Sequence, residues 1–191
     1  MTMIDTTTTA LDQTLLSGTY AIDPAHSRLG FVARHAMVTK VRGAFGVFEG
    51  AAQLNFQDPA ASSASVTIQV ASVDTAQAQR DEHLRTGDFF DATTYPTITF
   101  VSTAVEVVDD ETYRLVGDLT IKDVTKSVSI DFSYLGGSKD LYGNTRVGFE
   151  GSTVIKRSDW GVSFNAALET GGVLVSDKIT LEFDLAAVRQ D

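Results

Sequence analysis

The amino-acid sequence predicts an all-β protein, an antiparallel barrel that carries a helical flap. From Gly18 onward, apolar and polar residues alternate with a period of two, which is typical of strands with one face turned inward. Most alternating stretches are separated by turn sequences such as Asp23-Pro24 and Gly143-Asn144. Strands at this spacing favour a closed barrel or a sandwich over a parallel sheet with crossover helices.

The alternation also locates the individual strands. In residues 27–35, for example, Leu29, Phe31 and Ala33 are apolar. Arg28 and Arg34 fall on the other face, because successive side chains of a strand point in opposite directions. We therefore expect eight or nine strands, around residues 20–22, 27–35, 48–56, 65–70, 97–101, 113–121, 128–134, 147–155 and 179–185.

Glycines interrupt several of these strands. Because glycine weakens a strand, it usually marks a bend, a bulge or a close approach of backbone. On the inner face a missing side chain would also leave room in the lumen, whereas a glycine that serves curvature alone would not. Both interpretations stay open for Gly30, Gly43, Gly46, Gly50, Gly117, Gly148 and Gly151.

One long connection breaks the alternation. Residues 76–95 show no period of two, and the part from Ala76 to Leu84 is rich in helix formers, with Gly87 as the helix stop. Long connections in compact domains are usually either functional or disordered, and the adjacent Phe89 and Phe90 argue against disorder. We predict that this segment, called the flap below, packs over one end of the barrel.

The charge balance excludes several kinds of partner. The chain has 25 acidic and 15 basic residues, a formal net charge of −10 and a pI near 4.6. We therefore expect no nucleic-acid partner and no electrostatic attachment to an anionic membrane, since both need clustered Lys and Arg. No stretch approaches the roughly 20 apolar residues of a membrane span, so stable membrane insertion is not expected either. The absence of cysteine rules out disulfides, thiolate metal sites and a thiol nucleophile.

The chain divides into two parts. Residues 1–17 are expected to form a flexible or loosely docked N-terminal tail, and residues 18–191 a single barrel domain. The tail lacks the positive start and the apolar run of about 7–15 residues that a secretory signal needs. A cytoplasmic location is therefore expected.

Few residues could carry catalysis. The three histidines are His26, His35 and His83, which together with Asp81 could in principle serve a metal- or acid-dependent hydrolase. No two histidines have the spacing of a metal-binding pair, and neither a Gly-x-Ser-x-Gly elbow nor a phosphate-binding loop occurs. We expect a protein that is not an enzyme, with no metal and no cofactor, and keep the hydrolase as the alternative.

A set of short motifs, in a fixed order, carries a resemblance to a known family. The motifs are Ile22-Asp23-Pro24-Ala25-His26-Ser27 followed by Phe31 and His35, Gly43-x-Phe45 with Gly50, Arg80-Asp81-Glu82-His83-Leu84 leading to Asp88-Phe89-Phe90-Asp91, Tyr95-Pro96-x-Ile98-x-Phe100, Gly117-Asp118-Leu119-Thr120-Ile121, Arg157-x-Asp159-x-Gly161, and Gly171-Gly172. With these motifs the chain resembles the YceI-like family of lipid-binding proteins from about residue 18 to residue 188. It departs from the family at Tyr20, where Trp is common.

The resemblance implies a lipocalin-like, eight-stranded antiparallel barrel with a helical segment. It also implies that the lumen holds a long-chain lipid, typically a polyisoprenoid such as a prenyl quinone or prenyl phosphate, and sometimes a fatty acid derivative. The protein would then transport or store the lipid. Members of the family are often dimers, so a homodimer is expected here.

Residues of the flap, of the barrel mouth and of the wall are all expected to contact the lipid. Phe89 and Phe90 of the flap would close the mouth over the lipid, unless both anchor the flap permanently to the core. His83 and Arg85, with His26 or His35 opposite, would meet a polar head group. The wall itself is expected to contain Phe31, Leu54, Ile68, Phe100, Leu119, Ile130, Phe132, Phe149 and Phe183.

Overall fold

The computed structural model describes residues 11–191. Most of the chain is in strands, with one α-helix and five short 3-10 helices, which are labelled η. In chain order the elements are η1 (Gln13–Leu16), β1 (Gly18–Ile22), η2 (Pro24–His26), β2 (Arg28–His35), β3 (Thr39–Phe45), β4 (Phe48–Leu54), η3 (Pro59–Ala61), β5 (Ser63–Gln69), η4 (Val70–Ser72), β6 (Val73–Asp74), α1 (Ala78–Arg85), β7 (Thr97–Val107), β8 (Thr112–Ile121), β9 (Val124–Lys139), β10 (Thr145–Lys156), η5 (Arg157–Trp160) and β11 (Lys178–Arg189).

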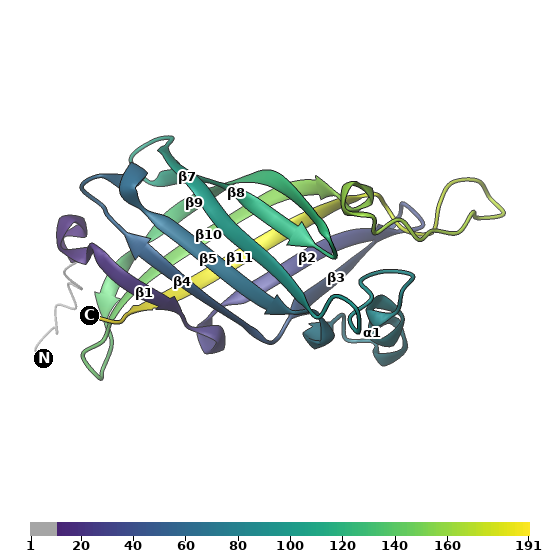
Figure 1. The fold of residues 1–191 in the computed structure, drawn as a ribbon, viewed down its shortest axis with the longest axis horizontal. Coiled ribbons are helices and arrows are strands. Elements are labelled where there is room, and N and C mark those ends of the chain that lie inside the picture. Colours follow the sequence, from purple (N-terminus) through teal and green to yellow (C-terminus); the bar gives the residue numbers. More distant parts are fainter. Residues whose placement is uncertain (1–10) are drawn as a thin grey trace, which may run out of the picture.

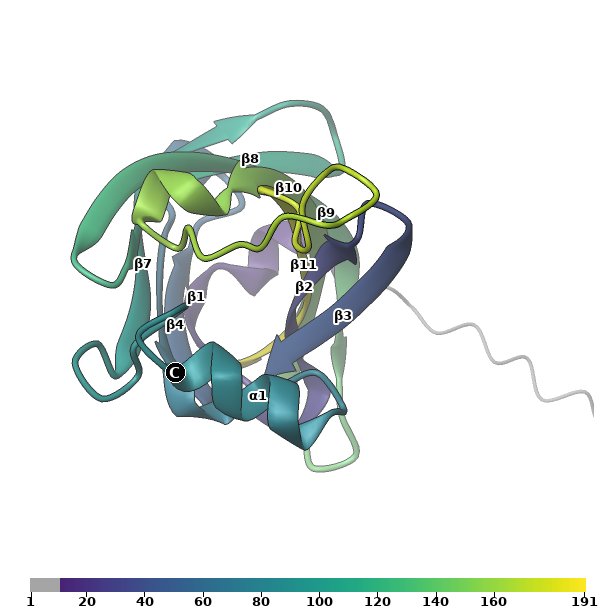
Figure 2. The same cartoon turned by 90° about the vertical axis from the view of Figure 1, so that its right-hand side faces the viewer.

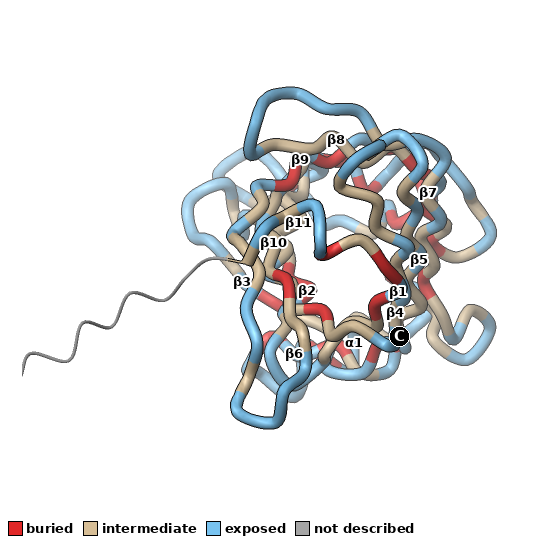
Figure 3. The backbone as a smooth tube through the Cα atoms, turned by 90° about the vertical axis from the view of Figure 1, so that its left-hand side faces the viewer, coloured by how far each residue is buried: buried red, intermediate tan, exposed pale blue. Residues whose placement is uncertain are grey.

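The strands close into an eight-stranded antiparallel barrel (Figure 1). Neighbours pair in the order β1-β4-β5-β7-β8-β9-β10-β11, and β11 pairs back with β1 to complete the ring. Seen from the end that holds the C-terminus, the strands surround a common axis (Figure 3). The predicted fold class is confirmed.

At the N-terminal side of the barrel, β1 and β2 together form one long interrupted strand, and β3 and β4 form another. β11 pairs with β2 through residues 180–184 and with β1 through residues 187–189, so β1 and β2 follow one another along the same neighbour. β3 and β4 are related in the same way, since β2 pairs with β3 and β1 with β4. Within the described residues β3 has a second partner only at Ala44 and Phe45, where it meets β6. Residues 39–43 therefore form a free sheet edge.

The flap forms as predicted, with slightly different bounds. The helix is Ala78–Arg85, and it ends at Thr86, whose backbone N–H returns to the carbonyl oxygen of His83. Arg85 ties it to the barrel by donating to the carbonyl oxygens of Ala71 (2.9 Å) and Val73 (3.1 Å). Figure 2 shows α1 crossing the end of the barrel, opposite the loop that leads into β11.

Two apolar clusters lie at opposite ends of the barrel. At the α1 end, Phe89 and Trp160 pack with Val70 and Ile98. At the other end, Leu16 and Tyr20 pack with Val147 and Ala187. Members of both clusters, such as Leu119 and Ala187, also line the cavity described below.

Part of the expected N-terminal tail belongs to this second cluster. Asp12 caps η1, Leu16 is only 2% exposed, and its carbonyl oxygen accepts a hydrogen bond of 2.8 Å from the Tyr20 hydroxyl. Residues 13–16 are therefore packed against the barrel and are not loosely docked. The sequence analysis missed this because one capped turn has no periodic signal. Residues 1–10 lie outside the described part of the chain.

Candidate ligand-binding site

A cavity of about 300 Å³ runs along the inside of the barrel. This volume lies at the lower end of the range that ligand sites in proteins usually have. Nearly all of its lining is apolar, and it extends from Tyr113 and Phe56 at one end to Leu84 and Phe90 at the other. An apolar lining of this length suits an elongated, hydrophobic molecule.

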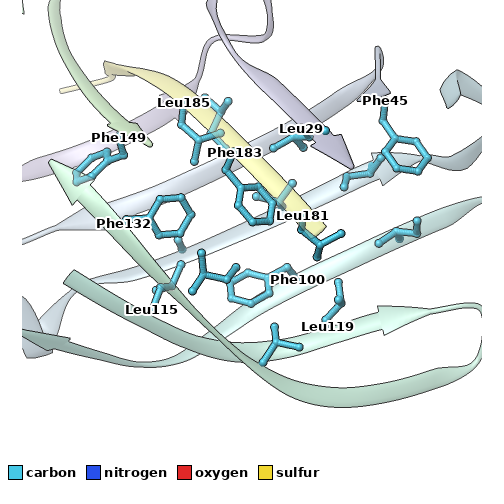
Figure 4. Close-up of a pocket in the computed structure, with 18 of the residues that line it drawn as sticks. Leu29, Phe45, Phe100, Leu115, Leu119, Phe132, Phe149, Leu181, Phe183 and Leu185 are labelled. Carbon is cyan, nitrogen blue, oxygen red and sulfur yellow. The ribbon is translucent and has the colours of Figure 1, made fainter. Parts of the chain in front are cut away.

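Every strand of the barrel contributes to the wall of the cavity. Figure 4 shows the rings of Phe100, Phe132 and Phe183 pointing into the same space from three different strands. The last two lie with their ring centroids 5.7 Å apart. The apolar residues nominated by the sequence all lie in the lining, namely Phe31, Leu54, Ile68, Phe89, Phe90, Phe100, Leu119, Ile130, Phe132, Phe149 and Phe183. That they contact a ligand stays a prediction.

Glycines make room for several of these rings. Phe31 is the cross-strand partner of Gly43, and Phe132 is the partner of Gly151. A Cβ atom at Gly43 would overlap the Phe31 ring, and one at Gly151 would come within 2.8 Å of the Phe132 ring. These two glycines therefore make room for the ring of the facing residue, so they serve more than curvature, but the space is filled by a side chain and is not left open in the lumen.

Arg157 is the one charged residue in the lining of this cavity. It follows β10 at the α1 end and is 7% exposed. Its guanidinium donates to three backbone carbonyl oxygens, those of Val162 (2.7 Å), Ser176 (2.9 Å) and Val175 (3.4 Å). A guanidinium has five N–H donors, so two are left for another acceptor.

The charge of Arg157 has no carboxylate partner among the described residues. Asp177 lies near enough to favour the charged form, but its carboxylate accepts hydrogen bonds from Ser158. Burial lowers the pKa of Arg157, because desolvation disfavours the charged form. A buried cation held by carbonyl dipoles attracts anions and carbonyl or phosphate oxygens.

The opposite end of the cavity is polar in a different way. Tyr113 lines the cavity, and its hydroxyl accepts a hydrogen bond of 2.8 Å from Gln13. Nearby, burial raises the pKa of Tyr134 to about 12, so its phenol stays neutral at ordinary pH. This end therefore offers the hydroxyl of Tyr113 to the cavity, whereas the α1 end offers a positive charge.

The polar residues nominated for the head group lie elsewhere. His26, His35, His83 and Arg85 are all absent from the cavity lining. His26 is exposed in η2 and pairs with Asp23 at 2.8 Å. The His83 ring contacts Phe164 (centroids 5.1 Å apart), and its Nε2 lies 2.8 Å from Asp88. Because the ring packs against Phe164, pairs with Asp88 through Nε2 and lies outside the cavity lining, the head-group role expected for His83 loses its geometric basis.

Arg85 and His35, the other two residues predicted to meet the head group, also lie outside the cavity lining. The guanidinium of Arg85 holds the flap to the barrel, as described above, and so faces the sheet and not the lumen. His35 is exposed at the end of β2, where its backbone bridges to Val175. Arg157 is the polar lining residue that these nominations overlooked. Its burial depends on the long-range fold, and the sequence analysis used it only as part of a family motif.

The alternative hydrolase needs its four residues to converge. Over residues 11–191, no three His, Cys, Asp or Glu side chains are grouped as metal ligands. Asp81 is buried and accepts hydrogen bonds from the backbone (2.8 Å) and hydroxyl (2.5 Å) of Thr75, so it acts as a structural link within the flap. The structure does not assemble the constellation that this hydrolase would use.

Other wall residues were visible in the alternation but were not nominated. Leu29, Leu115 and Leu181 are examples, and Figure 4 shows their side chains at the cavity. Each lies in phase with a nominated residue on its own strand. The structure also describes no helix in residues 11–191 that is long and apolar enough to cross a membrane.

Comparison with known proteins agrees with this geometry. A family model described as a YceI-like domain matches residues 20–187. The chain belongs to the YceI-like family. The matched range covers all but the first two and last two residues of the barrel, and it includes the flap between β6 and β7.

Several relatives of this YceI-like chain are known. A UPF0312 protein of Staphylococcus aureus (strain MSSA476) is 37% identical over 164 residues, which are 85% of this chain and 93% of the relative. A UPF0312 protein of Ectopseudomonas mendocina is also 37% identical, over 84% of this chain and 86% of the relative.

Solved structures share the barrel of this YceI-like protein. Burkholderia cenocepacia BcnA matches with a TM-score of 0.76 and 28% identity, over 86% of this chain and 98% of the other. The YCEI protein of Campylobacter jejuni matches with a TM-score of 0.71 and 30% identity, over 83% and 90% of the two chains. A polyisoprenoid binding domain from Saccharophagus degradans has a TM-score of 0.69 over 90% and 98%, and at 18% identity this likeness concerns the fold alone.

Proposed function

We propose that the protein binds one long-chain polyisoprenoid lipid in the barrel and carries or stores it unchanged. The observation that carries the proposal is the lining of the cavity, which is apolar along its length and has a single guanidinium, that of Arg157, at one end. Each methylene that leaves water contributes roughly 0.8 kcal/mol, so the chain would set the affinity. The polar end would set its direction.

The head group is best accommodated at Arg157. A prenyl phosphate or the carbonyl oxygen of a prenyl quinone would accept hydrogen bonds from the two remaining N–H groups. The Saccharophagus degradans domain, described as polyisoprenoid binding, has the same fold. A fatty acid derivative would meet the same two requirements and is the second ligand class to test.

Binding without chemistry is part of the proposal. His26 and His83 each pair with an aspartate away from the cavity, and the lining formed by the described residues contains no histidine and no carboxylate. A cytoplasmic location and a homodimer remain proposals as well. Cell fractionation tests the first, and native mass spectrometry of the purified protein tests the second.

Lipid extraction of the purified protein, followed by mass spectrometry, tests the function directly. We expect an unmodified prenyl lipid, or its uptake after a prenyl quinone is added to delipidated protein. The matched pair Leu115→Trp and Leu135→Trp provides the control, since Leu115 lines the cavity and Leu135 is exposed on β9.

The lumen variant should weaken uptake at least tenfold, because about 1.4 kcal/mol, or two buried methylenes, is enough for that change. The exposed variant should bind as the wild type does. A folded wild-type protein that takes up neither prenyl lipids nor fatty acids would overturn the proposal, as would the release of a chemically altered lipid.

A further inference from the structure

One stretch of this acidic protein contains no carboxylate. Residues 24–48 include four basic residues and no Asp or Glu, although the whole chain has a net charge of −10. The rest of the chain therefore carries −14. The stretch spans β2 and β3, so its charges are Arg28, Arg34, Lys40 and Arg42 of a single hairpin.

Three of these charges gather on the outer face of the hairpin. Phe31 and Ala33 line the cavity, so Arg34, which follows Ala33 on the strand, points outward. Arg34 lies directly opposite Lys40 in the strand register, and Arg42 lies two residues after Lys40, on the same face. Like charges placed opposite each other repel. None of the three is in an ion pair with another residue of the described chain.

The tip of the same hairpin is apolar. Met37 is 55% and Val38 79% exposed. Ala36 and Met37 both adopt the left-handed conformation (φ 49° and 61°), which costs about 1–2 kcal/mol for residues other than glycine. This turn therefore presents two apolar side chains to solvent at a cost in conformational energy. Strain of this kind is concentrated at functional sites.

The tip lies beside one end of the cavity. Ala33 and Val175 both line the cavity, and the latter bridges to His35 at the base of the tip. Towards the flap, Phe45 of β3 contacts Phe90, with ring centroids 5.9 Å apart. Figure 2 shows the β2–β3 hairpin and α1 bordering the same end of the barrel.

We propose that the β2–β3 hairpin docks on an anionic lipid bilayer, and that the lipid enters or leaves the barrel at this end. The second half rests on the function proposed above. The three cations would lie over lipid phosphates, and Met37 and Val38 would enter the interfacial region. Apposition to anions also relieves the repulsion between Arg34 and Lys40.

Two features of the structure favour this occupant. Free sheet edges often carry Lys to block pairing with another strand, but that accounts for Lys40 and not for Arg34 on the neighbouring strand. The opposite end of the barrel also has an apolar tip, Leu141 and Tyr142, yet the turn before β8 places Asp109, Asp110 and Glu111 there. An anionic surface would be repelled from that end.

The net charge of the chain argues against membrane attachment only when it is averaged over the whole surface. Within a Debye length of about 8–10 Å, a bilayer responds to the nearest charges, and those on the outer face of the hairpin are positive. Acidic residues do occur at this end, on the flap, where Asp88 faces His83 at 2.8 Å, in the loop before β11, which carries Glu169, and in the β8–β9 turn, which carries Asp123. The hairpin itself has none.

Vesicle flotation tests the proposal with the full chain. Vesicles of phosphatidylcholine with phosphatidylglycerol are compared with vesicles of phosphatidylcholine alone, at low and high salt. The test variant combines Arg34→Gln, Lys40→Gln and Arg42→Gln. A matched variant removes three basic residues from strand ends at the other end of the barrel, by Arg114→Gln, Lys139→Gln and Arg189→Gln.

A second pair of variants addresses the apolar tips. Met37→Asn with Val38→Ser is compared with Leu141→Asn and Tyr142→Ser. Asn tolerates the left-handed conformation of residue 37 better than Met does, so this variant keeps the turn. Thermal melts verify that all four variants fold.

We expect the wild type to float with the anionic vesicles only, and less so at high salt. The Arg34, Lys40 and Arg42 variant should lose binding on the order of a hundredfold, at about fivefold per charge, and the matched variant should lose about threefold or less. The Met37 and Val38 variant should also bind less tightly, and the Leu141 and Tyr142 variant should not.

Absence of vesicle binding by the wild type, or equal losses in matched variants, would overturn the docking proposal. Uptake of a prenyl quinone from detergent solution is measured in parallel. If uptake persists without vesicle binding, the docking proposal fails and the proposed function stands. If the hairpin binds vesicles but the protein takes up no lipid, the proposed function fails and only docking stands.

Discussion

The rings of Phe89 and Phe164 lie with their centroids 5.2 Å apart, so the flap meets the loop before β11 across the end of the barrel. The His83 ring packs against both of them. Phe89 is buried in the cluster around Trp160, whereas Phe90 is partly exposed and contacts Phe45. The two adjacent phenylalanines therefore have different environments. Phe89 is placed to hold the flap to the core, and Phe90 is placed to cover the end of the cavity.

We expect Phe89→Ala to destabilise the protein by about 3–5 kcal/mol, as for other buried aromatic truncations. Phe90→Ala should cost less and should speed the exchange of bound lipid, because this ring covers the cavity from the flap. Denaturant unfolding and lipid-exchange kinetics measure the two effects. If both variants lose the same stability and exchange at the wild-type rate, the flap is a fixed anchor and the lipid enters elsewhere.

The close packing of Gly117 predicts a cost for a single added methyl group. A Cβ at this position would overlap the Phe100 ring and lie 2.6 Å from the carbonyl oxygen of Val101. Gly117→Ala should therefore destabilise by about 1–3 kcal/mol. Gly148→Ala is the matched control, since its Cβ would find its nearest neighbour at 3.5 Å. Equal unfolding free energies for the two variants would contradict the close approach.

Arg157 is expected to discriminate between head groups. Arg157→Met removes the charge from the cavity and leaves the carbonyl oxygens of Val162 and Ser176 without their donor, at about 1–3 kcal/mol for each unsatisfied group. Its affinity for a prenyl phosphate should fall at least tenfold relative to a prenyl alcohol of the same length. Arg157→Lys, which keeps the charge, should retain part of the preference.

Calorimetric titration with the two lipids measures this preference, and Lys156→Met serves as the exposed neighbour control. A folded Arg157→Met protein that still prefers the phosphate would place the head group at the other end of the cavity.

Stability should fall at acid pH through Asp23 and Asp140. The Arg146 guanidinium bridges the two, at 2.6 Å and 2.9 Å, and it lowers the pKa of Asp23 from 3.8 to about 2. It also lowers the pKa of Asp140. Because the folded-state pKa is the depressed one, this stabilisation is present above the unfolded pKa and is lost as the pH falls from about 4 toward 2.

Thermal melts across that window measure the loss. Arg146→Gln should flatten the fall in melting temperature between about pH 4 and pH 2. Arg42→Gln removes an arginine with no carboxylate partner in the described chain, so its profile should follow the wild type. An unchanged profile in the Arg146 variant would show that the bridge does not contribute.

The sequence predicts the wall of the barrel well, because a period of two is a local signal. Once Phe132 is assigned to the inner face, Ile130 and Tyr134 are assigned to the same face, because they lie two residues away on the same strand. This assignment does not depend on the rest of the fold. The identity of the turns could be predicted for the same reason. What the alternation specifies is a face, and in a closed barrel that face is the lumen.

The ends of the cavity could not be predicted in this way. Leu16 is buried by residues far away in the chain, and Arg157 by the irregular loop that follows it, and neither lies in a periodic stretch. The same holds for Arg34 and Lys40, whose opposition depends on the strand register and on the three-residue turn between β2 and β3. The net charge of the chain gives no sign of this basic cluster, because it is a sum over all residues and does not depend on their positions.

The rings of Phe31 and Phe132 lie over Gly43 and Gly151, where the neighbouring strand has no side chain. The width of the lumen at these points depends on the rotamers of two rings and not on the spacing of the strands. A change of rotamer could widen or narrow the bore without breaking a backbone hydrogen bond. The barrel thus combines a fixed length with a lumen whose width adjusts at two points. This suits an elongated ligand that has branches at regular intervals.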